Sequence, residues 1–254
     1  MYNPNDGLFA GVISFSVGQE AIAAIVWYAT FIAIAIVSYL LGSVNTAIIV
    51  SKTMYKDDIR KHGSGNAGLT NVLRTYGKKA AGLTLLGDMM KSVIAIGIAG
   101  LFFGFQYHAG MSFSQPCYVA GLFAVVGHIF PIYYGFRGGK GVLTTATAAL
   151  VLTPIPFAIL ITLFIIIVAA SKYVSLGSVS VAVLYPVVVN GYIKFCAAPI
   201  PALVALSTIL IAILVVWCHR ENLQRISDRT ERKISFKKKD VEVQKKPDEE
   251  ADDE

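Results

Sequence analysis

Charged side chains are scarce in this sequence. Asp, Glu, Lys and Arg make up 15% of the 254 residues, whereas hydrophobic residues make up 55%, and the mean hydropathy is +0.63. Soluble domains usually carry roughly a quarter charged residues. The run from Ala21 to Leu41 contains no charge at all, and about 20 apolar residues suffice to span a bilayer as a helix. The composition therefore excludes soluble globules, coiled coils and disordered chains, and it predicts an all-α polytopic membrane protein.

Cysteine is also rare, and its positions do not suggest a metal site or a disulfide scaffold. Cys117, Cys196 and Cys218 lie in or beside apolar runs, where a thiol usually behaves as a small hydrophobic side chain. Carboxylates are equally sparse, because Asp88 is the only Asp or Glu within the expected spans. We therefore expect no metal and no cofactor. Asp88 could form an ion pair with Lys91 one turn later, or it could be functional.

Acidic residues are few in the body of the chain and concentrated at its end. Residues 240–254 hold 8 of the 16 acids, which leaves 20 basic and 8 acidic groups in residues 1–239. A basic membrane body predicts anionic partners such as lipid headgroups and phosphates, and no nucleic acid is expected. We divide the chain into an N-terminal extension, 1–20, a membrane domain, 21–233, and a charged C-terminal tail, 234–254.

Apolar segments predict about seven transmembrane helices. The expected spans are 21–41, which could continue to residue 51, then 80–103, 116–136, 141–153, 155–171, 174–195 and 199–218. With the N-terminus outside, the outer segments hold one basic residue, Lys194, whereas the inner segments hold 20. Because Lys and Arg accumulate on the cytoplasmic side, this split predicts an outer N-terminus and a cytoplasmic C-terminus. Every glycine-rich polar cluster then falls on the cytoplasmic face.

The longest of these polar clusters runs from Arg60 to Arg74. Its glycines allow successive N–H groups to converge on an anion, and its two arginines suit phosphate. Gly63, Gly65 and Gly68 form a GxGxxG pattern, but no strand precedes it, so a dinucleotide site is not expected. A flexible polar connector is the alternative to an anion site. The candidate binding residues of this cluster are Arg60, Gly63, Ser64, Gly65, Asn66, Thr70, Asn71 and Arg74.

Three further clusters follow on the same face. Arg137-Gly138-Gly139-Lys140-Gly141 precedes a short helix, where free N–H groups and the helix dipole favour an anion; a topological anchor is the alternative. Ser175 begins a later span and could cap that helix or contact a ligand. His219, Asn222 and Arg225 share one helical face beyond the last span, and an imidazole is the usual general base near neutral pH. His128 is expected to be a packing residue.

Together, these motifs resemble those of the PlsY family, the membrane acyl-phosphate:glycerol-3-phosphate acyltransferases of bacteria. The resemblance runs from Gly42-Ser43 to Arg225. It departs from the family at Leu69, where Ala is usual, and at Asn45, where Pro is common. It rests on Gly63-Ser64-Gly65-Asn66 with Thr70-Asn71-Val72-x-Arg74, on Gly127-His128 with Gly135-Phe136-x-Gly138-Gly139-Lys140-Gly141-Val142, and on His219-x-x-Asn222-x-x-Arg225.

The resemblance implies roles for these residues. Ser64 and Arg74 would serve catalysis and bind substrate phosphate, Lys140 with its glycines would bind glycerol 3-phosphate, and His219 and Asn222 would act in catalysis. The remaining implied substrate-binding residues are Ser43, Arg60, Gly63, Gly65, Asn66, Thr70, Asn71, Arg137, Gly138, Gly139, Gly141, Ser175 and Arg225.

The implied reaction transfers a fatty acyl group from acyl phosphate to the 1-hydroxyl of glycerol 3-phosphate, the first acylation of phospholipid synthesis, in the plasma membrane of a bacterium. No enzyme nucleophile is required, since the donor is a mixed anhydride. The base is either His219 or a substrate phosphate oxygen. Membrane lipids and the acyl-phosphate-forming enzyme are the expected further partners.

The alternative functions are a phosphate-ester transporter, a CDP-alcohol phosphotransferase, which would need several aspartates for metal, and a membrane anchor.

Overall fold

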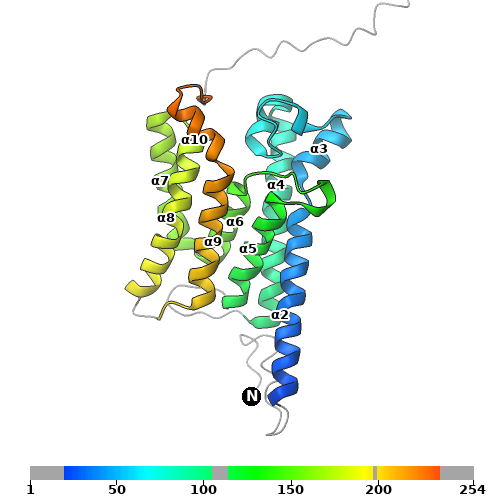
Figure 1. The fold of residues 1–254 in the computed structure, drawn as a ribbon, viewed down its shortest axis with the longest axis vertical. Helices are drawn as coiled ribbons and strands as arrows, with labels where there is room; N and C mark the ends of the chain where they lie inside the picture. Colours follow the sequence, from blue (N-terminus) through cyan, green and yellow to red (C-terminus); the bar gives the residue numbers. More distant parts are fainter. Residues whose placement is uncertain (1–19, 105–113, 197–198, 235–254) are drawn as a thin grey trace, which may run out of the picture.

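The computed structural model describes residues 20–104, 114–196 and 199–234, and these form a helical bundle (Figure 1). The expected N-terminal extension and most of the charged tail lie outside these residues. The elements in chain order are α2 (Glu20–Ser43), α3 (Thr46–Tyr55), the 3-10 turn η2 (Ile59–Lys61), α4 (Leu69–Phe103), α5 (Gln115–Ile129), η3 (Ile132–Tyr134), α6 (Val142–Leu152), α7 (Pro154–Ser171), α8 (Val174–Phe195), α9 (Ala202–Cys218) and α10 (Arg220–Ser227).

Each of the seven expected spans has a helix at its place, and no strand occurs in the part of the chain that the structure describes. Five helical segments are long and apolar enough to cross a membrane, and α9 joins them if it is counted together with α10, from which it is bent by 51°. Helix α6 has 11 residues, or about 17 Å at 1.5 Å per residue, against an apolar core of about 30 Å. The fold class is confirmed, whereas the number seven and the orientation stay predictions.

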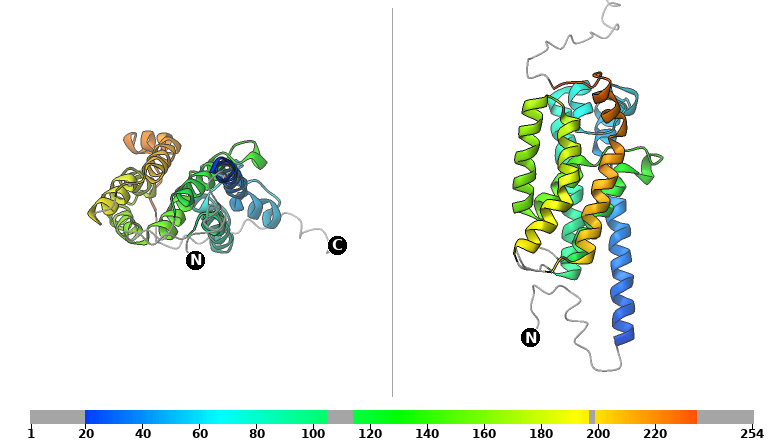
Figure 2. Two further views of the ribbon diagram at one scale, coloured as in Figure 1. Left: turned by 90° about the horizontal axis from the view of Figure 1, so that it is seen from below. Right: turned by 60° about the vertical axis from the view of Figure 1, so that its left-hand side comes forward.

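The close approach of α2 and α5 is made possible by glycine. A Cβ atom on Gly42 would clash with the Ala124 carbonyl, and one on Gly127 would clash with the Tyr39 carbonyl. Small residues at crossing points let membrane helices pack backbone to backbone. Helix α5 is the most buried span and also contacts α4, α6 and α9. It therefore forms the centre on which the other helices are arranged (Figures 1 and 2).

Several boundaries differ from the sequence prediction, among them the end of α5, which lies at Ile129 rather than at residue 136. Helix α2 breaks at Val44–Asn45, where the Asn45 side chain caps α3 by accepting from Ile48 N at 3.1 Å. Helix α4 begins at Leu69 rather than at residue 80, and it kinks at Gly77, where φ is 82°. A positive φ costs little at glycine, so the polar first turns of α4 can bend away from its apolar body. The expected connector is therefore partly helical.

All the polar loops gather at one end of the bundle, together with α3 and α10 (Figure 1). Helix α2 begins at the opposite end, so the described chain starts at one end of the bundle and finishes at the other. A smaller core lies under the first polar loop, where Ile59 and Ala67 are fully buried against Ile48 and Val72. Buried apolar anchors of this kind hold a polar loop in one conformation.

Candidate active site

A cavity of about 610 Å³ opens among α4, α6, α7, α8, α9 and α10. One part of it is polar and the other is apolar, which suits a substrate with a charged head and a hydrocarbon chain. The polar wall includes Ser64, Asn66, Thr70, Asn71, Arg74, Lys140, Ser175, His219, Asn222, Arg225, Thr230, Glu231 and Arg232. The apolar wall includes Val142, Leu143, Ala146, Ala149, Phe157, Leu160, Ile161, Phe164, Val181, Ala182, Tyr185 and Val215.

The first turns of three helices line this cavity without a side-chain cap. Helix α4 begins after Gly68, α6 after Gly141 and α8 after Tyr173, and none of these three residues caps its helix with a side-chain hydrogen bond. The first N–H groups of a helix have no partner within it and carry part of the positive end of the helix dipole. Several such ends around one cavity make a site that favours anions, phosphate above all.

Asn71 organises the first polar loop from within α4. Its amide nitrogen donates to the carbonyl oxygens of His62 at 2.9 Å and Asn66 at 3.1 Å, and its amide oxygen accepts from Ser64 N at 3.1 Å. A second amide, that of Asn45, donates to the Ala67 carbonyl oxygen at 3.2 Å. The loop is thus held by side-chain amides, and its Ser64 lines the cavity.

The second loop reaches the cavity by lying tightly against the end of α5. Gly138 N donates to the Ile129 carbonyl oxygen and Gly139 N to the His128 carbonyl oxygen, both at 3.1 Å. A Cβ on Gly139 would overlap the His128 imidazole. These two glycines therefore position Lys140 rather than line the cavity themselves, and Gly141, with φ at 77°, leads directly into α6.

A carboxylate that was not anticipated, Glu231, joins several of the predicted residues. It accepts from Ser175 Oγ at 2.8 Å, from Asn222 Nδ2 at 2.7 Å and from Arg225 Nε at 2.8 Å. Burial alone would raise the pKa of Glu231, but these three hydrogen bonds outweigh it and hold the pKa below its ordinary value. Glu231 is therefore a carboxylate at neutral pH, and it fixes Ser175, Asn222 and Arg225 relative to one another.

Lys140 lies beside this network and is the cation of the second loop that lines the cavity. Its Nζ donates to the Asn222 amide oxygen. Burial lowers the pKa of Lys140, and the neighbouring charge of Arg225 adds to this effect, whereas Glu231 opposes it. A partly desolvated ammonium next to the free N–H groups of α6 can hold a small dianion more strongly than either element alone.

His219 lines the cavity, and a contact with the backbone determines which of its ring nitrogens carries the proton. Its Nδ1 lies 2.7 Å from the Val215 carbonyl oxygen. Since a carbonyl oxygen can only accept, Nδ1 must carry the proton in the neutral ring. The lone pair is then on Nε2, so the tautomer fixed by the backbone is the one that a general base requires.

Twelve of the eighteen predicted site residues line the cavity. They are Gly63, Ser64, Asn66, Thr70, Asn71, Arg74, Lys140, Gly141, Ser175, His219, Asn222 and Arg225. The other six support the loops from outside it: Ser43, Arg60, Gly65, Arg137, Gly138 and Gly139.

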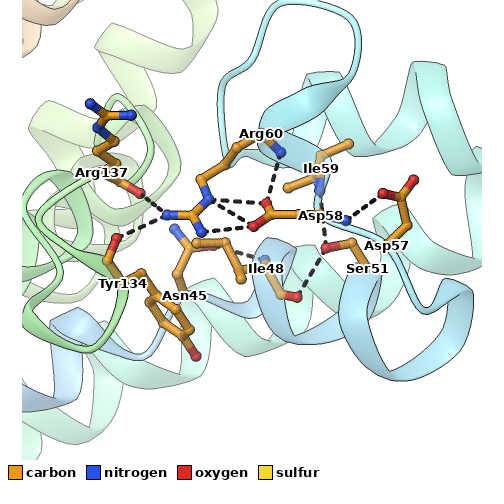
Figure 3. Close-up of polar contacts among 9 residues, drawn as sticks. All are labelled: Asn45, Ile48, Ser51, Asp57, Asp58, Ile59, Arg60, Tyr134 and Arg137. Carbon is orange, nitrogen blue, oxygen red and sulfur yellow. Dashed lines mark hydrogen bonds and ion pairs between the residues drawn. The ribbon is translucent and has the colours of Figure 1, made fainter.

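Arg60 illustrates this supporting group (Figure 3). Its guanidinium forms an ion pair with Asp58 at 2.7 Å and donates to the Tyr134 carbonyl oxygen at 2.9 Å. The hydrogen bond from Arg60 lowers the pKa of Asp58 to about 2. The charge of Arg60 is thus already neutralised, and the residue ties the first loop to the second. Ser43 is similarly engaged, because its buried hydroxyl donates to the Tyr39 carbonyl oxygen at 2.8 Å.

Sequence reasoning missed several residues at the cavity. Glu231, Thr230 and Arg232 follow α10, and nothing in their spacing indicates that the chain folds back over the site. Asp88 and His128 also line the cavity. Asp88 was expected from the sequence to be possibly functional because of its charge within an apolar span, whereas His128 was expected only to pack. The sequence offered no signal for the position of Glu231.

The chain matches a sequence model of one family over most of its length. The model for glycerol-3-phosphate acyltransferase matches residues 32–229. The glycerol-3-phosphate acyltransferase of Clostridioides difficile (strain 630) is 42% identical over 212 residues, which cover 82% of this chain and 98% of the relative. That of Geobacillus kaustophilus (strain HTA426) is 40% identical over 205 residues, with 80% and 95% covered.

Solved structures agree with these matches. The crystal structure of PlsY, an integral membrane glycerol 3-phosphate acyltransferase, in its glycerol 3-phosphate form, has a TM-score of 0.69 and 29% identity, and the match covers 81% of this chain and 96% of that one. The lysophosphatidic acid form gives a TM-score of 0.66. The family model, the relatives and the solved structures lead to one conclusion: the chain belongs to the glycerol-3-phosphate acyltransferase family of the PlsY type, whose members are integral membrane enzymes.

Proposed function

We propose that this acyltransferase uses acyl phosphate as its donor and forms lysophosphatidic acid and phosphate. One observation carries the proposal most directly: a single cavity combines uncapped helix N-termini and cations with an apolar wall. An acyl phosphate needs both surfaces, whereas glycerol 3-phosphate needs only the polar one. The solved PlsY structures in glycerol 3-phosphate and lysophosphatidic acid forms support the acceptor and the product.

The chemistry requires no covalent enzyme intermediate. The 1-hydroxyl oxygen of glycerol 3-phosphate attacks the acyl carbonyl carbon, the bond from that carbon to the phosphate oxygen breaks, and inorganic phosphate leaves. The hydroxyl proton passes either to His219 Nε2 or to an oxygen of the departing phosphate. The protein's own work is then to hold two phosphates close together, to orient the hydroxyl and to stabilise developing negative charge. We assign this work to Ser64, Arg74, Lys140, His219 and Asn222.

The charge distribution of the chain and the solubility of its acceptor suggest which side of the membrane the cavity faces. We propose a bacterial plasma membrane with the cavity facing the cytoplasm, because 20 of the basic residues lie in the predicted inner segments and an aqueous phosphate ester must enter from that side. Residues 21–233 would form the catalytic unit of about seven spans. The donor would come from the class of enzyme that makes acyl phosphates.

The test is a reconstitution with purified protein. Palmitoyl phosphate and labelled glycerol 3-phosphate should give labelled lysophosphatidic acid and one equivalent of phosphate, and palmitoyl-CoA, the control donor, should give none. Turnover with the thioester instead of the acyl phosphate would refute the donor assignment. A phosphate-ester transporter would move glycerol 3-phosphate across vesicles without forming product.

A further inference from the structure

The chain that follows α10 lies over the cavity and is fixed at two points. We call residues 228–234 the C-terminal strap. Glu231 is its first anchor, through its bonds to Ser175, Asn222 and Arg225. The second anchor is Ile234, whose N–H donates to the Lys172 carbonyl oxygen at 2.8 Å. Arg232 lies between the two anchors and lines the cavity, so its backbone is held in place before any ligand binds.

Arg232 shares the cavity with a second arginine. Arg74, on the first turns of α4, lines the same cavity, where the charge of Arg232 repels it and the weaker effect of the Glu231 charge attracts it. Among residues 20–104, 114–196 and 199–234, neither side chain forms a salt bridge or a hydrogen bond. Arg225 differs, because Glu231 and Glu221 neutralise it. Two guanidinium groups that line one cavity are stabilised when an anion lies between them.

The charges of the two substrates also favour a phosphate between Arg74 and Arg232. Each of the two substrates carries a phosphate with a charge of about −1.5 to −2 at neutral pH. Lys140 and the N-terminus of α6 can hold one of them. For the other phosphate, Arg74 alone would provide a single positive charge. Arg232 adds a second positive charge, so that the two arginines together match the charge of a dianion. A planar guanidinium can also bind two oxygens of one phosphate at once, while the acyl chain attached to that phosphate extends along the apolar wall.

We propose that Arg232 and Arg74 together bind the phosphate group of the acyl donor, so that the C-terminal strap completes the donor subsite. The proposal rests on the function proposed above and adds a binding residue to it. Glycerol 3-phosphate is then held by Lys140 at the N-terminus of α6. Because Arg232 is exposed and makes no described side-chain bond, its replacement should leave the fold intact.

The experiment measures binding rather than turnover. Isothermal titration of the detergent-solubilised full chain uses octyl phosphate, an unreactive lipid phosphate, and separately glycerol 3-phosphate. Arg232→Gln should weaken octyl phosphate binding by about tenfold or more, the loss typical of one charge-assisted hydrogen bond, and should change glycerol 3-phosphate binding by less than about twofold. Arg232→Lys, which keeps the charge but loses the fork, should show a smaller loss.

Lys233→Gln is the matched control. Lys233 is the next residue along the strap, it is exposed, and its Nζ lies over the Tyr173 ring rather than at the cavity. It should bind both ligands as the unaltered protein does. Unchanged octyl phosphate affinity in Arg232→Gln would overturn the proposal, and a loss confined to glycerol 3-phosphate would overturn the donor assignment. Failure of the proposed function would appear separately, as absent turnover with palmitoyl phosphate in the unaltered protein.

Discussion

Lys91 Nζ lies 2.8 Å from His128 Nδ1 and 3.0 Å from Asp88 Oδ1, inside the bundle and directly beneath the second polar loop. The same ammonium donates to the Val44 carbonyl oxygen at 3.0 Å. His128 in turn supports Gly139, through its carbonyl oxygen and through the close contact of its ring. A buried polar network thus connects the α2–α3 junction to the loop that carries Lys140.

This network predicts a large stability difference between a single and a double variant. Asp88 is 1% exposed and Lys91 is 6% exposed, so Lys91→Met leaves a buried carboxylate without its partner. Such a loss typically costs about 3–5 kcal/mol. The double variant Asp88→Asn with Lys91→Met removes both charges and should recover most of the loss. Unfolding free energies in mixed detergent would show this, and equal stability of the two variants would contradict it.

Local features of the sequence predicted the helices well, because the length of an apolar run and the glycines at its ends can be recognised from neighbouring residues. The early start of α4 was missed because Lys52–Lys79 is rich in charged and glycine residues. Its first turns are stabilised both by the loop that Asn71 organises and by the burial of Val72 in the smaller core.

The candidate site likewise contains residues that local sequence features predicted and residues that only the folded structure brings together. The motif residues that line the cavity were predicted because their glycines, amides and cations are typical of phosphate-binding motifs. Glu231 was not found, because it contacts Ser175 across 56 positions of sequence; no periodicity encodes a contact of that kind. Conversely, Arg60 looked like a phosphate ligand in the sequence, and only the structure shows that Asp58 neutralises it.

Lys140→Met should act mainly on the acceptor. The variant removes the charge but keeps most of the apolar stem, and a lost charge-assisted hydrogen bond is worth about 1.5–3 kcal/mol, or roughly 10- to 150-fold in affinity. We expect a raised KM for glycerol 3-phosphate and a much smaller change for acyl phosphate. Arg74→Met should raise the KM for acyl phosphate and lower kcat as well. Steady-state kinetics with each substrate varied in turn would separate them.

The control for this pair is Lys61→Met, which removes an exposed lysine of the first loop outside the cavity. Its kinetics should match those of the unaltered protein. If folded Lys140→Met keeps its KM for glycerol 3-phosphate, Lys140 is only a topological anchor.

Glycerol 3-phosphate binding should also weaken at high pH. Burial, followed by the charge of Arg225, lowers the pKa of Lys140, and the charged form is lost as the pH rises through this lowered value. Affinity should therefore fall at a lower pH than that of an ordinary lysine, about 10.4. Arg stays charged throughout, so Lys140→Arg should hold its affinity across the same range. Titration calorimetry between pH 7 and 10 tests this, and superimposable pH profiles would exclude Lys140 as the titrating group.

His219→Asn distinguishes the two possible bases. The asparagine amide can still donate to the Val215 carbonyl oxygen, which His219 Nδ1 approaches at 2.7 Å, but the acceptor Nε2 is lost. If His219 is the base, kcat should fall by about 10²- to 10⁴-fold with both KM values little changed. A decrease of less than about tenfold in a folded variant would assign the proton to a substrate phosphate oxygen instead.

Membrane sidedness can be tested with single cysteines at the two ends of the bundle, in a background where Cys117, Cys196 and Cys218 are replaced by alanine. Gln115 begins α5 at the end opposite the polar loops, and Lys61 lies in the first loop; both are exposed. The predicted inner segments hold 20 basic residues and the outer segments one, and basic residues resist translocation. In intact cells an impermeant thiol reagent should therefore label Gln115→Cys, and it should label Lys61→Cys only after permeabilisation. The opposite pattern would put the cavity on the outer face, where a cytoplasmic phosphate ester could not reach it, and would refute the membrane placement proposed here.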